Sequence, residues 1–252
     1  MPKILNDPTM ETGKIGGLQA FQFSGKRIEH LGATEYTLAT IAVDVSGSTW
    51  GFAKELRDAL IVAVEACKKS PRANNLLLRV IMFSTSLHGG VEEIHGFKPL
   101  SEVDTTLYPD FRPSGETPLC DAVFSAVGAT NSYAKKLMDQ DFLANGIVFV
   151  ITDGDDNKSK ATSLSIKEEL RRGTRAEEIE SLVTVLVGIN AGSYASILTA
   201  FQSDAGLDQY IDAGDATKGK LAKLANFVSQ SVSSQSQSLG TGGPSQNIAA
   251  TI

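Results

Sequence analysis

Four runs of predominantly apolar residues constrain the fold of this chain more than any other feature. They cover residues 39–45, 76–84, 146–152 and 182–189. A run that is apolar at successive positions is typical of a strand buried on both faces. Such strands belong to parallel sheets, in which helical connections cover both faces of the sheet.

Amphipathic segments separate these runs. Apolar residues recur at helical spacing, as in Leu56, Leu60 and Val64, and this spacing predicts helices that pack on the sheet. The predicted helices cover residues 52–69, 117–139, 164–172, 176–180, 194–201 and 217–230. Residues 91–100 alternate and predict one antiparallel edge strand, and residues 209–212 predict a short strand. We therefore predict an α/β fold with a doubly wound, mostly parallel central sheet and helices on both faces.

The chain divides into one domain with two tails. Residues 18–230 are predicted to form the domain, and residues 18–36 form a hairpin at its start. Residues 1–17 are predicted to form an arm. Residues 231–252 are rich in Ser, Gln and Gly, and they predict a flexible tail without a packing face.

Composition narrows the class of protein. A hydrophobic content of 42% and a charged content of 21% are ordinary for a soluble globular domain. The net charge of −6 argues against a nucleic-acid or anionic membrane surface, because both need a basic face. The sequence shows no signal-like segment and no apolar run of membrane-spanning length, so we expect a cytoplasmic protein. The two cysteines, Cys67 and Cys120, are expected to be reduced and buried.

Polar residues stand at three points where predicted strands end or helices begin. Asp44, Ser46 and Ser48 close the first apolar run, Thr117 opens the second long helix, and Asp153 closes the run 146–152. In open α/β sheets, ligands bind at the carboxyl ends of strands, where the strand order reverses. The strands that end at Asp44 and Asp153 would flank that point. We therefore expect these five residues to form one site.

The chemistry of these residues suits a hard divalent cation. Mg²⁺ takes about six oxygen ligands at roughly 2.1 Å and usually keeps several waters. No His or Cys in these stretches favours zinc. The sequence therefore predicts a Mg²⁺ site, with Mn²⁺ or Ca²⁺ as alternatives. A simpler interpretation is that Ser48 and Thr117 only cap helices. Three such coincidences at one sheet edge favour the metal.

The motifs Asp-Val-Ser-Gly-Ser at 44–48, Thr117, and Ile-Thr-Asp-Gly at 151–154 resemble the metal-ion-dependent adhesion site (MIDAS) of von Willebrand factor type A domains. The resemblance covers roughly residues 36–227 and is closest to bacterial cytosolic members found near tellurium-resistance and stress operons. It implies that Ser46, Ser48 and Thr117 bind the metal directly, and that Asp44 and Asp153 bind directly or through water. It also implies that one coordination position is open to a carboxylate from a partner.

Two features of this chain depart from the family pattern or add to it. Many members place a hydrophobic residue after the second Ser, whereas this chain has Thr49 and then Trp50. Trp50 is a candidate partner contact, because Trp is favoured at binding hot spots, or else it packs under its own loop. Asp155 and Asp156 are candidates to hold metal-bound waters, or else form a solvated acidic loop.

These observations favour a non-enzymatic, metal-dependent protein-binding module that grips an Asp or Glu of a protein partner, with no nucleic acid or membrane involved. One alternative is a structural or assembly component that binds through its terminal arms. A second alternative is a metal-dependent phosphoesterase, although no general base or nucleophile is evident beside the motifs. The sequence does not fix the oligomeric state.

Overall fold

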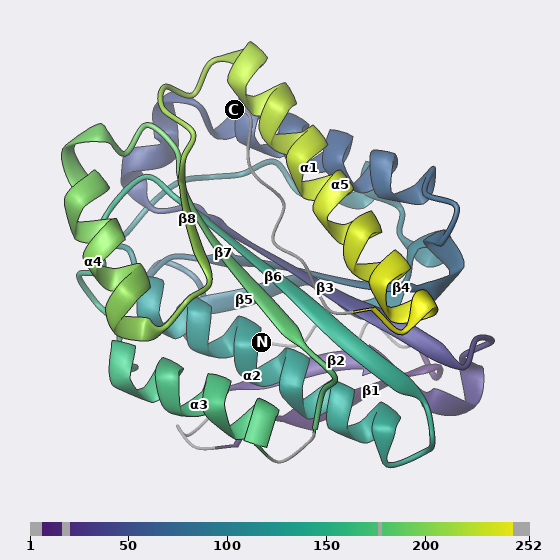
Figure 1. Cartoon of the computed structure of the whole chain (residues 1–252). Coiled ribbons are helices and arrows are strands. Elements are labelled where there is room, and N and C mark those ends of the chain that lie inside the picture. The colour runs from purple at the N-terminus through teal and green to yellow at the C-terminus, as the bar shows by residue number, and fades with distance from the viewer. Residues whose placement is uncertain (1–6, 17–20, 176–177, 244–252) are drawn as a thin grey trace.

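An eight-stranded sheet runs through the centre of the molecule in the computed structural model, which describes residues 7–16, 21–175 and 178–243 (Figure 1). The strand order is β1-β2-β5-β4-β3-β6-β7-β8. The strands are β1 (Met10–Lys14), β2 (Gln22–Lys26), β3 (Glu35–Asp44), β4 (Leu76–Phe83), β5 (Val91–Pro99), β6 (Leu143–Thr152), β7 (Leu182–Gly188) and β8 (Gln209–Asp212). Strands β4, β3, β6, β7 and β8 are mutually parallel. This confirms the predicted doubly wound α/β class.

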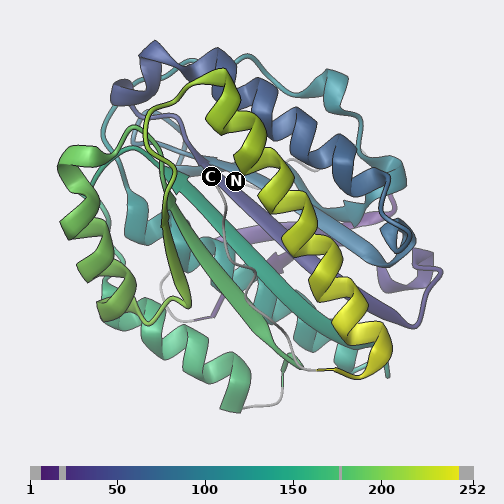
Figure 2. The same cartoon turned by 45° about the horizontal axis from the view of Figure 1, so that its top comes forward.

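Helices cover both faces of this sheet (Figures 1 and 2). The helices are α1 (Ala53–Lys68), α2 (Leu119–Met138), α3 (Ser163–Arg175), α4 (Ala195–Ala205) and α5 (Lys218–Thr241). Helices α1 and α5 lie side by side on one face, and α2, α3 and α4 lie on the other. Each layer has its own apolar core against the sheet, as expected for strands that are apolar on both faces. No helix in the described ranges is long and apolar enough to cross a membrane.

The strand order reverses between β3 and β6. The chain passes from β3 to β4 on one side, and β6 later joins β3 on the other side. The register pairs Val43 of β3 with Ile151 of β6, so Asp44 and Thr152 end the two strands at the same level. Asp44 therefore lies at the reversal of strand order, where open α/β sheets bind their ligands.

The N-terminal part of the structure differs from the predicted boundaries of the arm and the hairpin. Residues 10–14, expected within the N-terminal arm, form β1 and pair antiparallel with β2, so the hairpin begins earlier than residue 18. The predicted edge strand β5 is antiparallel to β4, but it is not an edge, because β2 pairs with it. Glu93 of β5 accepts hydrogen bonds from the backbone N–H and the hydroxyl of Ser24 of β2, at 3.1 and 2.6 Å. The Tyr133 ring of α2 stacks on Phe97, with ring centroids 5.1 Å apart.

The C-terminal helix corrects the predicted tail. Helix α5 continues to Thr241, eleven residues beyond the expected end at Gln230. Its last turns are held by polar contacts: Arg72 Nε donates to Ser236 Oγ at 3.1 Å, and Asn145 Nδ2 donates to the Gln235 carbonyl at 2.9 Å. The sequence did not reveal the packing face at the end of α5, because the residues there are Ser and Gln and pack through hydrogen bonds. Residues 244–252 of the predicted tail lie outside the described residues.

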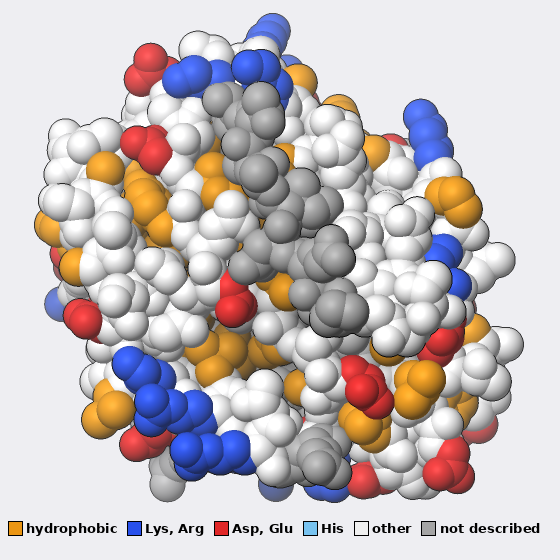
Figure 3. Space-filling view, in the orientation of Figure 1, with side chains coloured by type: hydrophobic (Ala, Val, Ile, Leu, Met, Phe, Trp, Pro, Cys, Tyr) orange, Lys and Arg blue, Asp and Glu red, His pale blue; other side chains and the backbone are white. Residues whose placement is uncertain are grey.

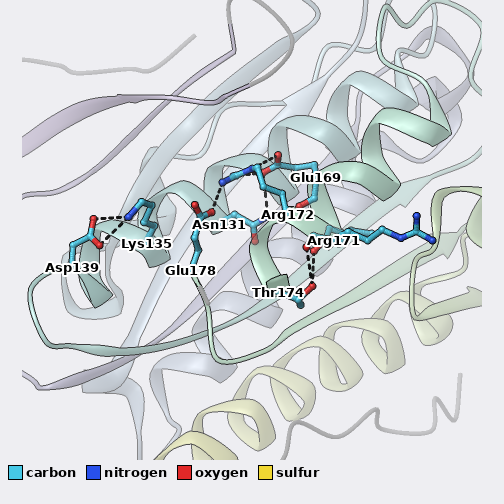
Figure 4. A network of polar contacts seen from close by, with 9 residues as sticks. Asn131, Lys135, Asp139, Glu169, Arg171, Arg172, Thr174 and Glu178 are labelled. Carbon is cyan, nitrogen blue, oxygen red and sulfur yellow. Dashed lines mark hydrogen bonds and ion pairs between the residues drawn. The ribbon is translucent and has the colours of Figure 1, made fainter. Parts of the chain in front are cut away.

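A polar network fastens α3 to α2 (Figure 4). Arg172 of α3 donates to both Glu169 oxygens, at 2.9 and 2.7 Å, and to Glu178. Asn131 of α2 donates to Glu169 Oε1 at 3.1 Å. Of the second helix predicted here, residues 176–177 lie outside the described residues and 178–180 are not helical. Lys and Arg side chains gather over α3 on the outer surface (Figure 3), and Arg171 points away from the network.

Candidate metal centre

The loop after β3 is folded by its own polar groups. Asp44, 1% exposed, accepts a hydrogen bond from the Ser46 backbone N–H at 2.7 Å. Its second oxygen accepts from the Thr152 hydroxyl at 2.7 Å, which ties the end of β3 to the end of β6. Thr49 then bonds back to the Ser46 carbonyl at 2.9 Å and closes a tight 3₁₀ turn over Gly47–Gly51. This turn places two serine hydroxyls beside the buried carboxylate.

Hydroxyls link the two acidic residues. Ser46 Oγ and Ser48 Oγ lie 3.1 Å apart, and the Ser48 hydroxyl donates to Asp153 Oδ1 at 2.8 Å. Asp153 follows β6 and is 6% exposed. Four of the five predicted ligands therefore form one hydrogen-bonded chain that runs from Asp44 through Ser46 and Ser48 to Asp153.

Thr117, the fifth predicted ligand, lies on a loop bonded to the first. The Gly47 N–H donates to the Gly115 carbonyl at 3.0 Å, and the Ser114 N–H donates to the Val45 carbonyl at 3.1 Å. Gly115 has a φ of +76°, in the left-handed region that favours glycine, and a Cβ there would lie 2.7 Å from the Thr85 hydroxyl. A glycine is therefore needed to bring this loop against its neighbours. The buried Thr117 follows two residues later.

Asn157 is a residue that the sequence analysis did not single out. Its side-chain oxygen accepts from the Thr117 N–H at 2.8 Å, and its own N–H donates to the Thr117 carbonyl at 3.1 Å. The two bonds hold Thr117 on both sides of its Cα. No local sequence pattern signals this contact, because forty residues separate the partners.

The acidic residues after Asp153 have local structural partners. Asp156 Oδ1 accepts from the Cys120 N–H at 3.0 Å and from the Ser159 hydroxyl, so it caps the start of α2. Asp155 accepts from the Asp156 N–H at 2.7 Å. Both side chains are half-buried. Asp156 therefore has a structural role at the start of α2, and a contact of Asp155 or Asp156 with metal-bound water stays a prediction.

Burial dominates the electrostatics of the two carboxylates. It raises the pKa of Asp44 to about 6, although hydrogen bonds from Ser46 and Thr152 act in the opposite direction. Burial also raises the pKa of Asp153. Among the described residues, no Lys, Arg or His forms an ion pair with either side chain. Two buried acids without a compensating positive charge are costly for the fold.

The donor set fits a hard divalent cation. Two carboxylates and three hydroxyls supply only oxygen, which suits Mg²⁺, Mn²⁺ or Ca²⁺. A cation would also remove the cost of the uncompensated acids. In the described part of the chain, no group of three or more His, Cys, Asp or Glu side chains is arranged to hold a metal. A site with two acids and three hydroxyls does not depend on such a group.

Comparison with known proteins supports the fold. No family model matches the sequence, and no curated protein matches it. The pilus adhesin SpaC from Lactobacillus rhamnosus GG, in its open conformation, resembles the structure with a TM-score of 0.55 and 12% identity over 91% of this chain. Proximal thread matrix protein 1 from the mussel byssus does so with a TM-score of 0.51 and 14% identity over 79%.

What these proteins share with the chain is the fold, a doubly wound α/β architecture of the von Willebrand A and Rossmann-like kind. This chain spans 33% of the adhesin chain and 47% of the byssus protein. One structure of the byssus protein, with a TM-score of 0.50, has a zinc-occupied MIDAS motif.

Proposed function

We propose that this protein is a metal-dependent binding module that holds a divalent cation between Asp44, Ser46, Ser48, Thr117 and Asp153, and grips a carboxylate of a protein partner through that cation. The hydrogen-bonded chain from Asp44 to Asp153 carries this proposal, because it gathers an all-oxygen set around two buried, unneutralised acids. The zinc-occupied MIDAS motif of the byssus protein supports a divalent cation at the corresponding kind of site.

The charge and number of the proposed ligands explain why the bound cation would bind a carboxylate of a partner. The three hydroxyls are neutral, so two carboxylates are the only full charges the five residues bring to the cation. A hard divalent ion takes about six oxygen ligands, so five protein ligands leave at least one position that is open or filled by water, and a carboxylate oxygen can take that position. The protein then recognises an Asp or Glu side chain, and no chemical step is required. The module is therefore proposed to be non-enzymatic.

Metal binding is tested first, by titration calorimetry of the chelator-treated protein with MgCl₂, MnCl₂, CaCl₂ and ZnCl₂. We expect saturable binding of at least one ion at a stoichiometry of one, and its loss in Ser48→Ala. Ser203→Ala is the matched control, because Ser203 is an exposed serine of helix α4 and is not in the ligand set. Unchanged binding in Ser48→Ala, or equal loss in Ser203→Ala, would contradict the proposed ligand set.

A further inference from the structure

The surface around the metal centre carries exposed apolar side chains. Trp50 is 73% exposed and lies two residues after Ser48, in the 3₁₀ turn Gly47–Gly51 that follows β3. Tyr194 is 43% exposed and Ile197 is 41% exposed, one helical turn further along α4. Large apolar side chains exposed together at a functional edge mark interaction sites.

Tyr194 lies against the loop after β6, which carries Asp153. A Cβ on Gly154 would be 3.9 Å from Tyr194 Cε2, so the ring is in van der Waals range of the residue after Asp153. The loop that carries Trp50 follows β3, and the loop that carries Tyr194 follows β7. Because β6 lies between β3 and β7, these loops stand on either side of the one that carries Asp153.

We infer that Trp50, Tyr194 and Ile197 form an apolar rim around the metal centre, and that this rim selects a protein segment whose Asp or Glu is flanked on both sides by apolar residues. The inference rests on the proposed function, because the metal-bound carboxylate fixes where the segment lies. An extended segment places its side chains alternately on opposite faces at about 3.3 Å per residue. The residues two positions before and two positions after the acid therefore share its face, and they can reach apolar side chains on both sides of the metal.

The composition of the rim favours a protein over an acidic polysaccharide. A sugar ring stacks on aromatic faces, and it gains little from the branched aliphatic side chain of Ile197. Apolar side chains from a peptide can bury against all three rim residues. Trp50 would be the main contact, because Trp is enriched among residues that dominate binding energy.

Trp50 also supplies the measurement, because it is the only tryptophan in the chain. Three blocked heptapeptides serve as probes. The first has a central Asp with one Leu two positions before it and one Leu two positions after it, the second replaces both Leu with Ser, and the third keeps both Leu and replaces Asp with Asn. In saturating Mg²⁺ we expect the first peptide alone to shift the Trp50 emission to the blue. We also expect it to bind at least about tenfold more tightly than the second, which corresponds to about 1.4 kcal/mol.

Single substitutions test the peptide preference of the rim separately from Mg²⁺ binding. Trp50→Ala and Tyr194→Ala should remove most of the tenfold preference, measured by anisotropy of labelled peptides, while the Mg²⁺ affinity stays unchanged. Leu107→Ala is the matched control, since Leu107 is also highly exposed but belongs to the 3₁₀ helix Thr105–Leu107 after β5. It should leave the preference intact.

The outcomes distinguish the two ideas. Equal, chelator-sensitive binding of the first two peptides would overturn the rim and leave the metal-binding module standing. Chelator-insensitive binding of all peptides, or no binding at all, would overturn both. Tight binding of the Asn peptide without metal would show an apolar surface that works independently of the cation, which contradicts the inference. So would a blue shift of Trp50 with an oligouronate and none with the first peptide.

Discussion

Replacement of Asp44 by Asn should make the metal-free protein more stable while it removes metal binding. The folded protein raises the pKa of Asp44 from 3.8 to about 6, chiefly by burial. The folded state therefore holds the proton more tightly than the unfolded chain does. The stability that this group contributes is fully present below pH 3.8 and is lost as the pH rises through about 6. At pH 7.5 the charged carboxylate costs about 3 kcal/mol.

The structure can accept the amide. The Asn oxygen can still accept from the Ser46 N–H, and its NH₂ group can donate to Thr152 Oγ1. The Thr152 hydroxyl has an alternative acceptor in the Gly154 carbonyl at 3.2 Å. We therefore expect Asp44→Asn to gain up to about 3 kcal/mol at pH 7.5 in chelator, a rise in Tm of up to about 10 °C. At pH 4 the gain should nearly vanish, because the native carboxyl group is then protonated.

Denaturant unfolding at both pH values, with chelator and with saturating Mg²⁺, measures these differences. Mg²⁺ at one hundred times its Kd should stabilise the native protein by about 2.7 kcal/mol and should not stabilise the variant. Asp139→Asn is the control, because Asp139 is exposed and paired only with Lys135 at the surface. An Asp44→Asn variant that is less stable than the native protein at pH 7.5 in chelator would refute the reasoning. A gain of equal size at pH 4 would refute it as well.

Three further predictions concern other residues. Asn157→Ala should weaken Mg²⁺ binding about tenfold, because it releases Thr117. Asn157→Asp keeps the acceptor oxygen and should retain most of the affinity. Calorimetry that finds no loss of affinity in the Ala variant would contradict the role of Asn157. Glu93→Gln should cost about 3–5 kcal/mol in urea unfolding, because it leaves Arg79, 2.7 Å away and fully buried, without its ion pair. A double variant, Arg79→Met with Glu93→Gln, removes the unpaired charge and keeps an acceptor for Ser24, so it should recover much of that loss. Burial lowers the pKa of His95 to about 3, so its contribution to stability is present above pH 6.5 and lost as the pH falls, at about 1.4 kcal/mol per pH unit. The stability difference between the native protein and His95→Gln should therefore change by about 2 kcal/mol between pH 7 and pH 5, and a constant difference would count against a buried neutral His95.

The sequence predicted the strands best where burial leaves little choice. Strands β3, β4, β6 and β7 are apolar on both faces, so their positions follow from the positions of the apolar runs in the sequence. The predicted ligands could be grouped because parallel strands bring their carboxyl ends to one edge. Long-range polar contacts could not be predicted in this way. Neither the bonds between Asn157 and Thr117 nor the packing of Gln235 against Asn145 leaves a periodic pattern in the sequence.

The N-terminal hairpin has a practical consequence for anyone who divides this protein. A fragment that begins at β3 keeps every proposed metal ligand, yet it loses Ser24, whose two hydrogen bonds satisfy the buried Glu93. It also strips the Phe23 ring from Phe97 and Tyr133, which it meets edge-on. Strand β5 then becomes an open edge that invites pairing with another molecule. The smallest unit that folds cleanly is therefore larger than the unit that contains the site.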